Sequence, residues 1–380
     1  MTAPGFSEYV EELQLIDHHV HGAYRFDGDE TRFLNALNEG NPEALREPLR
    51  SYDSQLGFAI RRWCSELIDL PRHAEASAYW ARRSALGEAE VGRRMTRAAG
   101  VSDWLVDTGF KSADFLDPAG VAEQSGGNAY ELVRLEYLAE QIFAELANPA
   151  DFAVTFQAEL ARLARTAVGA KSVLAYRAGF NRDLSQPDER AVARAAHAWR
   201  EALDAGAPVR LTDVTLIAHG IHTALDLRLP LQFHVGFGDR ELDLDRANPL
   251  LLLDFLRAVE AQDTPILLLH CYPFEREAGY LAQAFENVYV DVGLATNFLG
   301  VQSAALLGRA LELAPFGKIL YSSDAFGPGE LHYLGARLWR NAITTVIGGW
   351  VESDDWSETD ARKVVQLIAR ENARRVYSLP

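Results

Sequence analysis

Two histidines, His19 and His21, have the residue type and the spacing that could bind a metal ion. They end a stretch in which the apolar pair before Asp17 leads into three histidines. If this stretch is a β-strand, its side chains alternate, so that Asp17, His19 and His21 share one face and His18 lies on the other. Two imidazoles at the end of one strand can reach the same divalent ion, and Zn²⁺ favours such nitrogen ligands. A histidine-rich surface turn is the alternative interpretation.

Three further polar residues, His234, His270 and Asp324, each follow an apolar run that could be a buried strand. Taken alone, each could be an ordinary core or loop residue, because buried histidines occur and aspartate is common in turns. Three imidazoles and one carboxylate would complete a hydrolytic zinc site and leave one position for water. The metal hypothesis therefore depends on a fold that brings these residues and the first two histidines together.

The elements that must position these residues alternate along the chain between strands and helices. We predict eight strands, at residues 14–21, 101–109, 131–136, 170–177, 231–235, 265–270, 288–292 and 318–323. Such alternation is typical of parallel strands with helices packed outside, and eight units favour an α/β fold, a (β/α)₈ TIM barrel. An open doubly wound sheet is disfavoured, because no Gly-x-Gly-x-x-Gly follows the first strand.

The predicted barrel occupies one domain, residues 1–380, with a helical insertion after the first strand at about residues 22–100. In a barrel of this kind the active site lies at the C-terminal ends of the strands. All five candidate residues stand at predicted strand ends, so the fold would collect them at one mouth.

Composition limits the classes of partner. The net charge of −17 makes nucleic acid and an anionic membrane surface unlikely partners, and we expect a small-molecule substrate instead. Two cysteines are too few for a disulfide framework or a thiolate zinc site. Neither a secretory signal nor an apolar run of membrane-spanning length is visible, so we expect a cytoplasmic protein, with a homo-oligomer left open.

The motif Asp17-x-His19-x-His21, with histidines on the fifth and sixth strands and aspartate on the eighth, resembles the pattern of the amidohydrolase superfamily, in its amidohydrolase-2 type. More narrowly, four stretches resemble the amidohydrolase domain that is fused to glutamine-synthetase-like domains in nodulin-type proteins. These stretches are residues 171–179, 232–239, 270–279 and 321–324.

The resemblance implies that His19, His21, His234 and Asp324 bind one divalent ion, with Zn²⁺ as the expected identity. His270 would be catalytic, polarising the substrate, or would bind a second ion. A metal-activated water would attack a C–N bond, an amide or γ-glutamyl-type amide, of a small carboxylate-bearing substrate, with Asp324 as proton shuttle. The alternative is a non-oxidative decarboxylase of an aromatic or enolic acid on the same barrel.

The number of ions depends on Lys171, because many binuclear relatives bridge two metals with a carbamylated lysine on the fourth strand. If that strand continues to Arg177, the two residues are about 20 Å apart. Arg177 would then lie at the mouth and Lys171 near the bottom, which favours one ion. Arg177 could grip a substrate carboxylate or form a rim salt bridge. Asp239 and Arg276, in the following loops, could contact the substrate or pair with each other.

Overall fold

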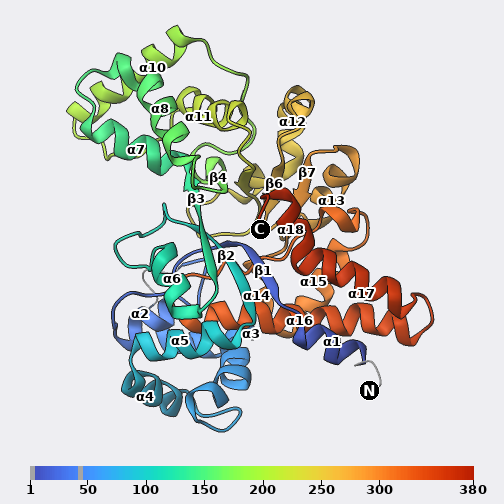
Figure 1. Cartoon of the computed structure of the whole chain (residues 1–380). Helices are drawn as coiled ribbons and strands as arrows, with labels where there is room; N and C mark the ends of the chain where they lie inside the picture. The colour runs from blue at the N-terminus through green and yellow to red at the C-terminus, as the bar shows by residue number, and fades with distance from the viewer. Residues whose placement is uncertain (1–4, 42–45) are drawn as a thin grey trace.

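One curled parallel sheet forms the centre of the molecule (Figure 1). The computed structural model describes residues 5–41 and 46–380, and within these residues the strands follow one another around the sheet in chain order. They are β1 (Leu15–Val20), β2 (Val101–Asp107), β3 (Asn128–Arg134), β4 (Gly169–Ser172), β5 (Leu231–His234), β6 (Ile266–Leu269) and β7 (Val288–Val290). Every neighbouring pair is parallel, as a barrel of βα units requires.

Residues 319–325, which we call the closing segment, lie between β7 and β1 and form backbone hydrogen bonds with residues of both strands. Leu320 N–H donates to Val290 O over 3.0 Å, which attaches the segment to β7. On the other side, His18 N–H donates to Tyr321 O over 3.2 Å and Asp324 N–H donates to His19 O over 3.1 Å. The predicted eighth strand is therefore present as an extended segment without a regular ladder. The TIM-barrel prediction is confirmed.

Helices connect the strands and cover the outside of the sheet. They are α1 (Phe6–Glu12), α2 (Glu30–Asn35), α3 (Gln55–Ala59), α4 (Ala76–Leu86), α5 (Glu88–Ala98), α6 (Pro118–Ser125), α7 (Leu135–Glu145), α8 (Phe152–Leu163), α9 (Leu174–Arg177), α10 (Glu189–Asp204), α11 (Val214–Asp226), α12 (Leu253–Val259), α13 (Glu275–Ala284), α14 (Ala295–Leu299), α15 (Ser303–Ala310), α16 (Gly329–Glu352), α17 (Glu358–Gln366) and α18 (Asn372–Val376). Among these helices, none is long and apolar enough to cross a membrane.

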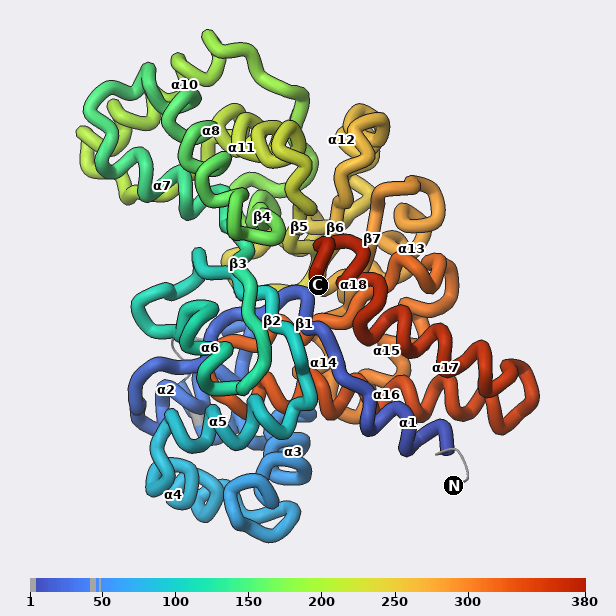
Figure 2. Tube along the Cα trace, viewed as in Figure 1, coloured from blue at the N-terminus to red at the C-terminus, as the bar shows by residue number. Residues whose placement is uncertain are grey.

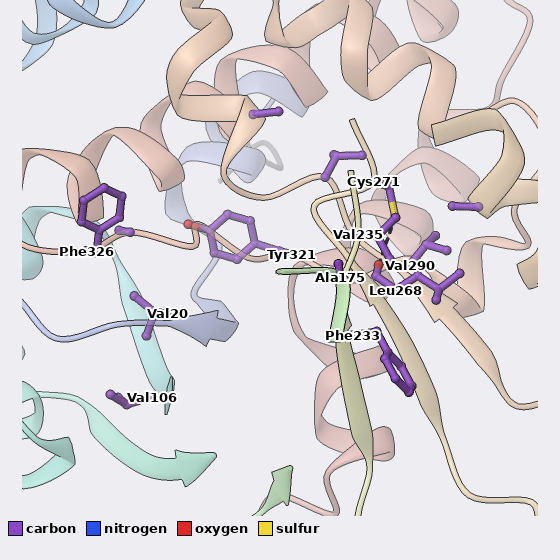
Figure 3. Packing of buried hydrophobic residues seen from close by; sticks show 14 of the residues in the cluster. Val20, Val106, Ala175, Phe233, Val235, Leu268, Cys271, Val290, Tyr321 and Phe326 are labelled. Atoms are coloured by element: carbon purple, nitrogen blue, oxygen red, sulfur yellow. Dashed lines mark hydrogen bonds between the residues drawn. The ribbon is translucent and has the colours of Figure 1, made fainter. Parts of the chain in front are cut away.

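Alternating strand side chains build two cores. Phe233, Leu268 and Val290 point outward into the large cluster between sheet and helices, part of which Figure 3 shows. Leu267 and Leu269, on the opposite face of β6, belong to a smaller cluster inside the barrel. The residues after α18 complete this inner cluster, and Figure 2 shows the C-terminus between β1 and β6. The inner core therefore supports the site from below.

The insertion predicted at about residues 22–100 contains α2 to α5; its residues 42–45 lie outside the described residues. Helix α5 packs against the long α16 at the side of the barrel. Arg340 of α16 fixes this contact, because its guanidinium donates to Ala99 O over 2.8 Å and to Leu13 O over 2.9 Å. The insertion is therefore attached to the barrel wall, and Glu39 from it reaches the cavity at the mouth.

The predicted strand at residues 170–177 is wrong in its second half. β4 ends at Ser172, and the next residues form the short helix α9. Glu136 causes this early end, because its Oε1 accepts hydrogen bonds from Ser172 Oγ over 2.6 Å and from Val173 N–H over 3.0 Å. These bonds hold the chain in a turn, and Lys171 lies one residue from the end of its strand.

Two glycines of α16 allow a test of how tightly the closing segment is held. A Cβ at Gly335 would lie 2.4 Å from Ser323 Cβ, next to Asp324, whereas a Cβ at Gly349 meets no atom within 4 Å. Gly335→Ala should lower the free energy of unfolding by about 1–3 kcal/mol through overpacking. Gly349→Ala should raise it by roughly 0.5–1 kcal/mol through helix propensity. Chemical denaturation of both variants measures this, and equal effects would contradict tight packing at Ser323.

Candidate metal centre

Every strand of the sheet, together with the closing segment, brings at least one polar side chain to the same mouth of the barrel. Because the C-terminal ends of parallel strands share one edge, these side chains converge although they are far apart in sequence. They are His19 and His21 from β1, Asp107 from β2, Arg134 from β3, Lys171 from β4, His234 from β5, His270 after β6, Asp291 after β7 and Asp324 in the closing segment.

Asp324 is at the centre of this group. Its Oδ1 lies 3.0 Å from His19 Nε2 and 3.3 Å from His21 Nε2, and its Oδ2 lies 3.2 Å from His270 Nε2. Ligand atoms of His19, His270 and Asp324 lie within 4.8 Å of one another, as do those of His19, His21 and Asp107. All of these residues are buried, so the arrangement is a compact, buried set of groups that could bind a metal ion.

The ring orientations of His19 and His21 suit metal binding. His19 Nδ1 lies 2.8 Å from Gln232 Oε1, and His21 Nδ1 lies 3.2 Å from the backbone O of Asp107. Both partners accept hydrogen bonds only, so each Nδ1 carries the hydrogen and each Nε2 presents a lone pair to the centre. Tying the far nitrogen of a ligand histidine to an oxygen is the usual way to fix its orientation.

Several buried polar atoms of the centre lack hydrogen-bond partners among the described residues, although buried polar atoms in proteins usually have one. His270 Nδ1 and Nε2 and Asp324 Oδ1 have no hydrogen-bond partner among the described residues. Burial lowers the pKa of His19 to about 3 and that of His270 to about 4, so both rings are neutral and able to act as ligands. Burial opposes ionisation of Asp324, but the nearby histidines hold its pKa well below the usual range. Neutral imidazoles, an ionised carboxylate and unsatisfied lone pairs fit a divalent cation.

Lys171 belongs to this centre, contrary to the prediction that it lies near the bottom of the barrel. Its Nζ is 2.7 Å from His19 Nε2 and 3.8 Å from Asp107 Oδ2. The prediction failed because β4 stops at Ser172 instead of continuing to Arg177. With Lys171 beside His19, the length of β4 does not favour one ion over two.

His234 lines the cavity but belongs to neither ligand group. Its ring lies beside those of Tyr176 and His270, with centroids 4.7 and 4.6 Å away. Its Nε2 is 3.1 Å from Phe237 O. Of the four ligands suggested by the sequence, the structure thus brings together His19, His21 and Asp324, with His270 nearer to them than His234.

The alternation predicted for β1 is wrong at His18, which points into the barrel as His19 does. The pairing of β1 with β2 shifts register between Asp17 and Val20, so strict alternation is lost. His18 Nε2 lies 3.0 Å from Asp291 Oδ2 inside the barrel. Asp17 instead accepts a hydrogen bond from Ser323 N–H over 3.0 Å, and burial raises its pKa to about 8. Asp17 holds the closing segment.

A cavity of about 260 Å³ opens above the centre, and two of the three predicted substrate contacts line it, Arg177 and Asp239. Arg177 is 9% exposed; its Nη2 lies 3.1 Å from Glu140 Oε1, and its Nη1 has no hydrogen-bond partner among the described residues. Arg276 is not among the lining residues. It forms an exposed ion pair with Glu312 at 2.7 Å, on the outside of α13.

Sequence reasoning missed Asp107, Asp291 and Glu39. The first two end the apolar runs of β2 and β7, the same signal that identified His234 and His270, so they could have been found. Glu39 lies in the insertion without any motif. It lines the cavity, where burial and the charges of Asp324 and Asp239 raise its pKa to about 8.

Two solved structures share the fold of this chain. A protein of Lactobacillus casei ATCC 334, provisionally assigned as a metal-dependent hydrolase, has a similar crystal structure, with a TM-score of 0.85 and 27% identity, and the match covers 98% of this chain and 97% of that one. A uronate isomerase of Bacillus halodurans C-125 shares the fold, with a TM-score of 0.61 and 14% identity over 99% and 96% of the chains.

Among curated proteins, Protein fluG of Emericella nidulans is 30% identical over 225 residues, which are 56% of this chain and 26% of that protein. The chain thus spans about a quarter of the length of that relative. The family model for amidohydrolases matches residues 71–379. Because this match covers more than half of the chain, the chain belongs to the amidohydrolase family.

Proposed function

We propose that this protein is a metal-dependent amidohydrolase that cleaves a C–N bond, an amide or γ-glutamyl-type amide, in a small carboxylate-bearing substrate. The observation that carries the proposal is the buried set of ligand atoms around Asp324 that lack hydrogen-bond partners among the described residues. Membership of the amidohydrolase family and the likeness to the Lactobacillus casei protein support the same function.

We assign one divalent ion, expected to be Zn²⁺, to His19, His21, His270 and Asp324. His270 replaces His234 in this set, because its Nε2 lies 3.2 Å from Asp324 Oδ2. Both ligand groups contain His19, whose Nδ1 is engaged with Gln232, so a single atom, Nε2, serves both groups. Sharing one ligand atom supports one ion position.

When bound, the ion would supply a water activated as a nucleophile at neutral pH. Asp324 would accept the proton of that water at a carboxylate oxygen and donate it to the leaving amine as general acid. His234, which faces the cavity beside Tyr176, would contact the substrate. Burial of the surrounding residues excludes bulk water from the reacting atoms.

The charged side chains in the cavity wall suit a substrate that carries an anionic group. Arg177 lines the cavity, its Nη2 pairs with Glu140 and its buried Nη1 has no hydrogen-bond partner among the described residues, so the guanidinium has a donor left that could bind a carboxylate. Arg210 also lines this wall, and Glu39 and Asp239 add carboxyl groups to the cavity. A substrate with a carboxylate and a polar or basic group elsewhere would match these charges.

The reaction class is tested by incubating metal-loaded protein with N-acyl and γ-glutamyl amides and, in parallel, with aromatic and enolic acids. We expect amine release that a chelator abolishes and Zn²⁺ restores. Release of CO₂ without amine would establish the decarboxylase alternative instead. Turnover that persists after the chelator has removed the metal would contradict both functions.

The ligand assignment is tested by comparing His270→Asn with His234→Asn. His270→Asn should lose most of the bound metal, because it removes an imidazole within the ligand group, whereas His234→Asn should retain close to one equivalent. Elemental analysis of the purified variants measures this. The reverse result would restore His234 as the ligand, and a wild-type content near two equivalents would contradict the single ion.

The role of Arg177 is tested by Arg177→Lys on the substrate found in the screen. We expect KM to rise about ten- to hundred-fold, the equivalent of one lost charged hydrogen bond, because a point charge cannot replace the guanidinium fork. Arg276→Lys is the matched control, since Arg276 pairs with Glu312 on the surface, and its KM should not change. An unchanged KM in Arg177→Lys, with only a loss of thermal stability, would make Arg177 a structural residue.

A further inference from the structure

We propose that Tyr377, which follows α18, is a positioning residue that holds Gln232 and, through it, sets the orientation and tautomer of the ligand His19. The inference rests on the proposed metal function. Tyr377 does not contact the nitrogen and oxygen atoms that would bind the metal, and it does not line the substrate cavity. Tyr377 is 4% exposed and packs in the core inside the barrel.

The hydroxyl of Tyr377 joins two polar residues beneath the metal centre. Gln232 Nε2 donates to Tyr377 Oη over 2.7 Å, and His18 Nδ1 lies 3.0 Å from the same oxygen. Gln232 Nε2 also donates to the backbone O of His18 over 2.9 Å. On its other side, Gln232 Oε1 lies 2.8 Å from Nδ1 of His19. Tyr377 is thus two hydrogen bonds away from a metal ligand.

The positions of the hydrogens follow from these partners. Both amide hydrogens of Gln232 are used, one on Tyr377 and one on the carbonyl of His18, so its Oε1 must face His19. Because that oxygen can only accept, His19 carries its hydrogen on Nδ1 and presents the Nε2 lone pair to the ion. A flipped amide would bring two oxygens together at His18, because Gln232 Oε1 would then face the backbone O of that residue. The network therefore permits one arrangement.

A second branch of the same network reaches His270. Having accepted from Gln232, the Tyr377 hydroxyl donates to His18 Nδ1, and His18 donates through Nε2 to Asp291 Oδ2 over 3.0 Å. Asp291 Oδ1 accepts from His270 N–H over 2.9 Å, which fixes the backbone of His270 in its left-handed conformation, φ 72°. Tyr377 is therefore connected to histidines on both sides of Asp324.

Burial keeps the phenol able to serve as this junction. It raises the pKa of Tyr377 far above its usual value, so the hydroxyl keeps its hydrogen throughout the working pH range. A phenylalanine at this position would fill nearly the same space but would leave one Gln232 hydrogen and His18 Nδ1 without partners. The expected result is a looser Gln232 and a less well oriented His19.

The test compares Tyr377→Phe with Tyr321→Phe. The control removes a buried hydroxyl that has no hydrogen-bond partner among the described residues, at a residue 1% exposed. The Kd for Zn²⁺ is measured by competition with a chromophoric chelator, and the Tm of the metal-free proteins is measured in parallel. Tyr377→Phe should weaken Zn²⁺ binding about 10- to 100-fold, as other losses of support behind metal ligands do, and Tyr321→Phe should not.

A double-mutant cycle shows whether the effect passes through Gln232. In a Gln232→Met background, Tyr377→Phe should weaken Zn²⁺ binding by less than three-fold. A Kd for Tyr377→Phe within two-fold of wild type, with a lower Tm, would make Tyr377 a packing residue and overturn the inference. Full additivity in the cycle would overturn the route through Gln232.

A readout independent of metal separates this inference from the proposed function. Histidine ¹⁵N chemical shifts of the metal-free wild type should report His19 with its hydrogen on Nδ1. His19 with its hydrogen on Nε2 would overturn the inference. If wild type shows the expected tautomer but binds no metal, the proposed function fails while the network stands.

Discussion

The hydrogen bonds that close the barrel are the interactions on which the site depends. The closing segment lies against β1, and Ser323 N–H donates to Asp17 while Asp324 N–H donates to the backbone O of His19. These bonds place the Asp324 carboxylate directly beside the histidines of β1. A shift of the closing segment by one residue would remove Asp324 from all three imidazoles. Barrel closure and assembly of the centre are thus the same event.

Burial makes this arrangement costly unless a cation is present. Carboxylates and imidazoles taken out of water need partners, and unsatisfied buried polar atoms normally destabilise a protein. Around Asp324 the chain provides acceptors and lone pairs, and Lys171 Nζ lies 2.7 Å from His19 Nε2. The outer hydrogen bonds of His19 and His21 fix both rings with their lone pairs inward. The buried polar atoms without partners lower local stability, and the same arrangement preorganises a binding site.

The barrel and much of the centre could be predicted because both depend on local patterns. Apolar runs that end in a polar residue are visible in the sequence, and parallel strands bring such ends together. His19, His21 and Asp324 were found in this way. Arg276 could not be rejected, because only the structure shows that α13 directs it to Glu312 on the surface.

The failures have a common cause, which is contact between residues far apart in sequence. The end of β4, and so the position of Lys171, is set by Glu136 from another βα unit. The inward direction of His18 follows from a shift in the pairing with β2 and from its contact with Asp291. Glu39 reaches the cavity from an insertion whose path no periodic pattern reveals. None of these effects could be predicted from the residues that are neighbours in the sequence.

The separation of the ligands along the chain has a consequence for how the protein is made. Ser323 and Asp17 are 306 residues apart in sequence, and Asp324 and His19 belong to the same two segments, the closing segment and β1. During synthesis, the histidines of β1 leave the ribosome long before the aspartate exists, so they cannot hold the ion in its final geometry. Contacts this distant in sequence form late in folding, because their loop-closure entropy must first be overcome. A metal ion bound by these residues would therefore enter an almost finished barrel and would not act as the template around which the chain folds.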